Sequence, residues 1–76
     1  MRKVTMELQD RDVDNVKFLR DLVHARSNAQ VVSVALSLAK FLVSALRIPG
    51  TQILIRNPDG SLDRVVMPEL EDVAAR

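Results

Sequence analysis

Three aspartates at alternate positions, Asp10, Asp12 and Asp14, form the densest group of side chains that could carry chemistry. Closely spaced carboxylates can work as an acid–base pair or hold a hard cation. These three stand directly before and within the first turns of an apolar helical pattern, where negative charge is favourable. We therefore interpret them as the start of a helix, with Asp10 as its N-cap.

Other residue types that enzymes use are sparse in this chain. It has no cysteine and one histidine, His24, so disulfides and thiolate metal sites are excluded. We find no nucleophile paired with a base, no glycine-rich phosphate loop and no metal-spaced cluster. His24 is near the predicted end of the first helix, where we expect it to favour the helix dipole and bind nothing. We therefore expect no enzyme activity, no metal and no cofactor.

The segment Ser27-Asn28-Ala29-Gln30 is a second candidate site. It fits a capping box, with Ser27 as N-cap and Gln30 three residues later. Outward backbone N–H groups at such a helix start bind anions, phosphate included. An ordinary capped helix has the same sequence pattern, so both interpretations stay open.

The chain before and around these residues predicts one strand and two helices. Val4, Met6 and Leu8 alternate with polar residues, which predicts a short strand over 3–8 with two distinct faces. Apolar residues recurring every three or four positions predict a helix over 11–25. A second helix is predicted over 27–47.

This second helix is apolar on almost every face, and Lys40 is its only charge before Arg47. A helix of this kind belongs in a core, and the rest of so short a chain cannot cover it. Its longest apolar segment, 31–46, is shorter than the ~20 residues that span a bilayer. We therefore expect a buried helix and no membrane association.

The C-terminal part changes character after Ile48-Pro49-Gly50, which ends the helix. Residues 52–56 and 62–67 predict a β-hairpin around the turn sequence Asn57-Pro58-Asp59-Gly60. The tail that follows is predicted to be a short helix or frayed. We divide the chain into a first domain over 1–48 and a C-terminal hairpin and tail over 49–76.

Size and composition narrow the function further. A chain of 76 residues buries only roughly 60% of its unfolded surface, so without disulfides or a metal it needs a partner subunit. The net charge of +1 lacks the basic excess of a non-specific nucleic-acid binder. With two Phe, no Trp and no Tyr, the chain also lacks an aromatic platform for stacking bases. The absence of cysteine and of a signal peptide favours a cytoplasmic location.

The order of strand, helix, capped turn and apolar helix resembles ribbon-helix-helix domains of the Arc/MetJ/CopG type over roughly residues 2–47. The residues that carry the resemblance are the alternating run 4–8, Asp10, the stripe Val16/Leu19/Val23 and the segment 27–36. That segment looks like the family pattern Ser-x-Ser-Glu-x-(Ile/Val)-Arg-x-Ala-Leu. The chain departs from the family at Ala25-Arg26, where a glycine is usual, and at Ser33, where many members have a basic residue.

The resemblance implies a mainly α fold with a short N-terminal strand, completed as an intertwined homodimer. The C-terminal β-hairpin predicted above lies outside the common family core. Each subunit contributes one strand to a ribbon that enters the DNA major groove. It implies a sequence-specific transcriptional regulator, a repressor in particular, with double-stranded DNA and a second copy of the chain as partners. The hairpin could further join dimers into tetramers.

The family's site residues map onto matching positions here. The base-reading positions are Lys3, Thr5 and Glu7, and the phosphate-binding helix start is Ser27, Asn28 and Ala29. Beyond this mapping, Arg2 and Arg26 are additional candidate phosphate contacts, with an ordinary solvated charge as the alternative for each. If two strands pair about Thr5, Lys3 faces Glu7 of the other subunit, and a cross-strand ion pair competes with DNA. Two further functions stay open: a protein-interaction or structural module that keeps the fold without binding DNA, and an antitoxin.

Overall fold

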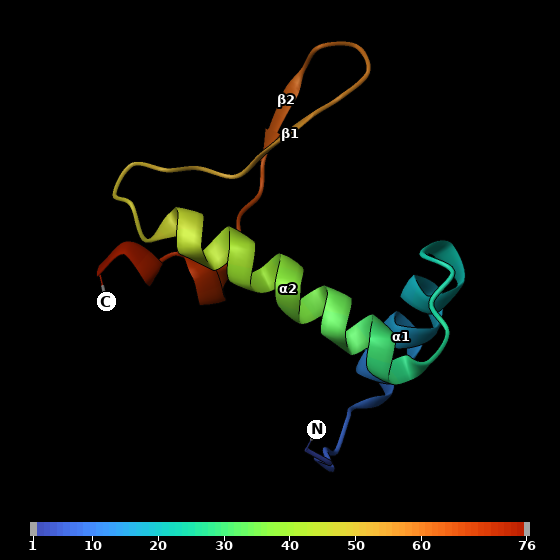
Figure 1. The fold of residues 1–76 in the computed structure, drawn as a ribbon. Coiled ribbons are helices and arrows are strands. Elements are labelled where there is room, and N and C mark those ends of the chain that lie inside the picture. The colour runs from blue at the N-terminus through green and yellow to red at the C-terminus, as the bar shows by residue number, and fades with distance from the viewer. Residues whose placement is uncertain (1, 76) are drawn as a thin grey trace. The chain divides into compact units, whose positions relative to one another are not determined.

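The computed structural model describes residues 2–75, which form a mainly helical chain with a small sheet after the helices (Figure 1). The helices are α1, Asp10–Leu22, and α2, Asn28–Leu46. The strands are β1, Leu54–Arg56, and β2, Leu62–Arg64. The chain divides into two compact units, Met1–Leu36 and Ser37–Arg76, and the division falls inside α2.

Helix α1 begins one residue earlier than expected, because Gln9 and not Asp10 is its N-cap. The backbone N–H of Gln9 donates to Asp12 Oδ2 at 3.3 Å, and the N–H of Asp12 donates to the Gln9 carbonyl at 2.9 Å. The prediction of Asp10 as cap is therefore wrong. The carboxylate of Asp12 decides the position, since it stands three residues after Gln9, as in a capping box.

The same helix ends at Leu22, three residues before the predicted boundary at 25. His24 adopts a left-handed backbone conformation with φ of +53°, and the Ala25 N–H donates to the Arg20 carbonyl at 3.1 Å. Such a bond between residues five positions apart is one of the two hydrogen bonds that define a Schellman C-cap. Glycine is the usual left-handed residue in that motif. Histidine is one of the few other residues enriched in that conformation, so the helix stops without a glycine.

Helix α2 agrees with its predicted bounds to within one residue at each end. Ser27 Oγ accepts from the Gln30 N–H at 3.1 Å, which confirms Ser27 as the capping residue. The side chain of Gln30 reaches back as expected, but its Oε1 accepts from the Arg26 N–H, at 2.6 Å, one residue before the cap. The helix start is thus fixed by two side chain–backbone bonds.

The helical bounds also show that α2 is not apolar all round. Five polar residues are spaced alternately three and four positions apart, so they share one narrow face of the helix. They are Gln30, Ser33, Ser37, Lys40 and Ser44. Every other α2 residue from Val31 on is apolar, so one polar line runs along an otherwise apolar helix.

Residues 2–9 have no regular secondary structure, so the strand predicted over 3–8 is absent from the single chain. The apolar residues of this segment, Val4, Met6 and Leu8, are 47–74% exposed. A strand needs a neighbour that pairs with its N–H and C=O groups. Within residues 2–75, β1 and β2 pair only with each other, so the N-terminal segment has no such neighbour.

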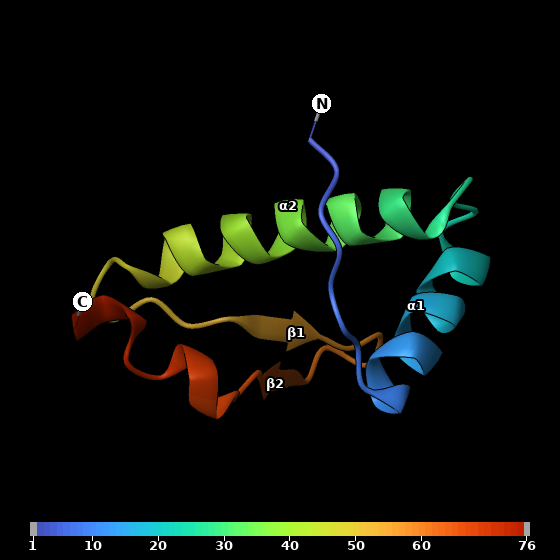
Figure 2. The same ribbon diagram turned by 90° about the horizontal axis from the view of Figure 1, so that it is seen from below.

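The C-terminal unit contains the expected hairpin, shorter than predicted. The strands β1 and β2 are antiparallel, with Leu54 opposite Arg64 (Figure 2). The Gly60 N–H donates to the Asn57 carbonyl at 2.9 Å, and Gly60 has φ of +89°, which only glycine adopts freely. The tail forms two short 3-10 helices, Pro68–Leu70 and Val73–Ala75.

The chain by itself has almost no core. Val31, 2% exposed, is the one buried hydrophobic residue among those that the structure describes. In the C-terminal unit, the half-buried side chains come from the last turns of α2 and from the loop, hairpin and tail that follow. By length and composition alone, α2 could also cross a membrane, a test that the core helix of a soluble protein passes too.

Candidate nucleic-acid interface

The three predicted base-reading residues, Lys3, Thr5 and Glu7, are exposed on the irregular N-terminal segment. Val4 and Met6, which lie between them in the sequence, are exposed as well, so the segment has no buried face in the single chain. The single chain does not align the three side chains on a strand face. Their assignment as base contacts therefore stays a prediction, as does that of Arg2, which is exposed on the same segment.

The predicted phosphate-binding segment, residues 26–29, is assembled at the start of α2. Asn28 is the first helical residue and Ala29 the second. Helix geometry leaves the N–H groups of such residues without an intrahelical partner. The next N–H, that of Gln30, is already bound by Ser27, so the first two are the ones left to bind an anion.

Arg20 of α1, which no sequence pattern indicates as a site residue, also reaches this helix start. Its Nη1 donates to Asn28 Oδ1 at 3.3 Å, which places a guanidinium beside the partial positive charge of α2. The contact depends on the C-cap at His24, which turns the chain back between the two helices. No local sequence signal links positions eight residues apart across a turn.

An apolar hollow of about 180 Å³ lies beside the same helix start. It is lined by residues from the N-terminal segment, α1 and α2, including Leu8, Val13, Val16 and Val32. The chain itself leaves this space unfilled. The hollow is open to solvent, so its apolar lining is a surface that a partner could cover.

Among the residues that the structure describes, Asp59 in the hairpin turn is the one side chain whose pKa is clearly shifted. Asp59 Oδ1 accepts from Ser61 Oγ at 2.6 Å and from the Ser61 N–H at 2.9 Å, and these bonds lower the pKa of the carboxyl from 3.8. The side-chain amide of Asn57 donates to Ser61 and to Asp63, both at 3.0 Å. The network stabilises the turn.

Among residues 2–75, no three His, Cys, Asp or Glu side chains lie close enough to hold a metal ion. Asp10, Asp12 and Asp14 thus form no such group, and Asp12 serves the α1 cap.

Comparison of the chain with models of protein families, with curated proteins and with solved structures gave no match.

Proposed function

We propose that this protein is a homodimeric, sequence-specific DNA-binding regulator of the ribbon-helix-helix type, which represses transcription in the cytoplasm. One observation carries the proposal: an alternating N-terminal segment, an amphipathic helix, a capped turn and a mostly apolar helix follow in that order, and their apolar side chains are exposed. A second copy is the partner that completes each of these elements.

Exposed apolar side chains in both units support an interface. Val4 and Phe18 in the first unit are 74% and 63% exposed, and Phe41 in the second unit is 71% exposed. Large apolar side chains that remain in water favour association with a partner, because burying them is favourable.

Residues 3–8 would gain a strand partner in the dimer. Two copies that run antiparallel about Thr5 pair the backbone groups that the single chain leaves unpaired. Val4, Met6 and Leu8 then face inward onto the helices, and Lys3, Thr5 and Glu7 face outward. The strand is thus a property of the pair of chains and not of one chain.

Helix α2 would contribute the centre of the dimer. Val34, Leu38 and Phe41 follow one another at helical spacing on a single face, and they are 49%, 59% and 71% exposed. The polar line from Gln30 to Ser44 borders this apolar face along one side and would lie at the solvent-exposed edge of the interface. A membrane span is a poorer explanation, because Lys40 would then lie in the hydrocarbon near mid-helix.

The DNA-binding mechanism follows from the outward face of the ribbon. Lys3 donates to guanine O6 and N7, Glu7 accepts from cytosine N4, and Thr5 contacts either a polar edge or a thymine methyl. The α2 start, with the free N–H groups of Asn28 and Ala29, grips a phosphate on each side. A bound dimer occludes a promoter, and its two-fold symmetry requires a pseudo-palindromic site.

The test is fluorescence anisotropy of the full chain with genomic upstream DNA over a salt series. Arg2 and Arg26 of both subunits would neutralise about four phosphates, so the logarithm of the binding constant should fall with that of salt at a slope of about −4. Replacing Lys3 and Thr5 together by Ala should lower the affinity for the specific site while leaving the dimer folded. Lys40→Ala is the matched control, since it removes the same charge from the polar face of α2.

One outcome would instead favour the protein-interaction module. A folded dimer that binds no DNA at low salt would fit the near-neutral charge, the missing basic residue at Ser33 and the exposed hairpin. A protein that is soluble only in detergent would contradict both the DNA-binding and the protein-interaction proposals, because it would place α2 in a membrane.

A further inference from the structure

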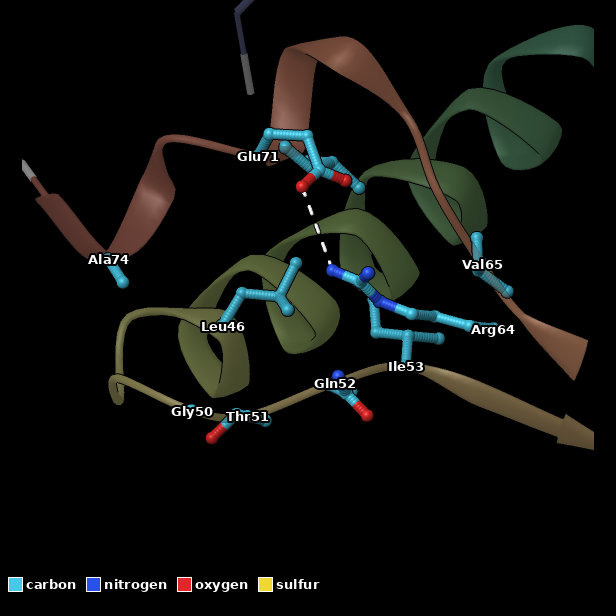
Figure 3. A pocket seen from close by; sticks show the side chains of 10 residues that line it. Leu46, Gly50, Thr51, Gln52, Ile53, Arg64, Val65, Glu71 and Ala74 are labelled. Atoms are coloured by element: carbon cyan, nitrogen blue, oxygen red, sulfur yellow. Dashed lines mark ion pairs between the residues drawn. The ribbon is translucent and has the colours of Figure 1, made fainter.

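A second hollow, of about 220 Å³, lies in the C-terminal unit at the end of α2 (Figure 3). Four stretches of chain build its wall: the end of α2, the loop before β1, the end of β2 and the tail. Leu46, Ile53, Val65 and Leu70 supply apolar side chains, and all four are half-buried. The hollow is open to solvent, and its lining combines these apolar side chains with polar and charged ones.

One positive and one negative side chain stand together at this lining. Arg64 Nη2 lies 3.7 Å from Glu71 Oε2, and the two side chains are 52% and 43% exposed. Figure 3 shows the guanidinium and the carboxylate pointing toward one another beside Leu46 and Ile53. Exposed ion pairs are held weakly and screened by salt, so both groups can bind further charges.

We propose that this hollow binds a small aliphatic zwitterion, of the class of the branched-chain α-amino acids. Lying antiparallel to the ion pair, the ligand sets its carboxylate against the Arg64 guanidinium and its ammonium against the Glu71 carboxylate. Its side chain contacts Leu46 and Ile53. In this arrangement each charge of the ligand faces an opposite charge of the protein, and the apolar side chain of the ligand is removed from water.

The volume agrees with this ligand class. A dry cavity of about 150 Å³ holds benzene, so by the same ratio 220 Å³ holds about nine non-hydrogen atoms, the size of leucine. Because the hollow is shallow and few groups converge on it, we expect a Kd on the order of 1 mM.

The test is a titration of the uniformly ¹⁵N-labelled full chain with L-leucine, followed by amide chemical shifts at low salt. Saturable shifts are expected for residues around the hollow, among them Gln52, Val65 and Glu71. Two analogues isolate the charges: 4-methylpentanoate lacks the ammonium group, and 3-methylbutylamine lacks the carboxylate. Each should bind about tenfold more weakly, as expected when a partner of the ion pair is left unmatched.

Two substitutions complete the test. Arg64→Gln removes the positive charge at the hollow and should weaken leucine binding about tenfold. Arg56→Gln is the matched control, because it removes the same charge from the same hairpin at a residue that does not line the hollow. The amide spectrum itself reports whether each variant is folded. Absence of saturable shifts in the tens-of-millimolar range, or equal leucine binding by both variants, would overturn the proposal. Both readouts are independent of DNA binding.

Discussion

Replacing Leu38 by alanine should weaken the proposed dimer without unfolding each chain's helices. Full burial of a leucine side chain contributes about 1.5–3 kcal/mol. Since 59% of Leu38 is still exposed in the single chain, dimerisation can contribute roughly 0.9–1.8 kcal/mol per copy. Two copies give roughly 2–3.5 kcal/mol for the dimer, before any cavity left behind adds to the loss. The dimer Kd should therefore rise by about 20- to 400-fold.

The measurement is sedimentation equilibrium over a dilution series in buffer without detergent. Leu62→Ala is the control, because Leu62 is the same residue type with 58% exposure but lies on β2, outside the proposed interface. Its dimer Kd should stay within about twofold of the original. If Leu38→Ala and Leu62→Ala change the dimer Kd equally, the assignment of the α2 face to the interface is wrong.

Three further outcomes are expected. Ser27→Ala leaves the Gln30 N–H without its acceptor and should lower the free energy of unfolding by about 1 kcal/mol in a thermal unfolding experiment. Ser27→Asn should retain most of that stability, because asparagine is also a good N-cap. His24→Gly should raise the free energy of unfolding by up to about 1 kcal/mol, since glycine adopts the left-handed C-cap without steric strain; an unchanged melting temperature would argue against that conformation. Ser61→Ala should raise the pKa of Asp59 toward 3.8 in a carboxyl NMR titration. Because the folded pKa is lowered, the bonds to Asp59 stabilise the turn above pH 3.8 and are lost as pH falls through the folded pKa.

Periodicity and turn chemistry predicted both helices and the hairpin, because these signals are local. The capping residue Ser27 and the turn at Gly60 were both predictable in this way. The end of α1 was not, since His24 takes the place of the expected glycine and no pattern rule requires it there. The start was also displaced, because glutamine is an unusual cap and Asp10 is a better one by preference alone.

The N-terminal strand shows a different limit. Alternation in residues 3–8 predicts which side chains would share a face, but a strand also needs a hydrogen-bonding neighbour, and one sequence cannot say where that neighbour is. The hollow near Arg64 was likewise unpredictable. Its residues come from four separate stretches between Leu46 and the tail, and only the folded unit brings the two charges within 3.7 Å.

The low net charge of the chain is compatible with DNA binding because of where the charges lie. The two segments that the proposal brings to DNA, 2–7 and 20–29, contain four basic residues and two acidic ones: Arg2, Lys3, Arg20 and Arg26 against Glu7 and Asp21. The rest of the chain is therefore slightly acidic, since the whole has a net charge of +1. A dimer of this kind attracts DNA weakly at a distance but presents a positive face at contact. Non-specific binding should then be poor, and affinity should depend on the base-reading residues of the ribbon more than it does in strongly basic binders.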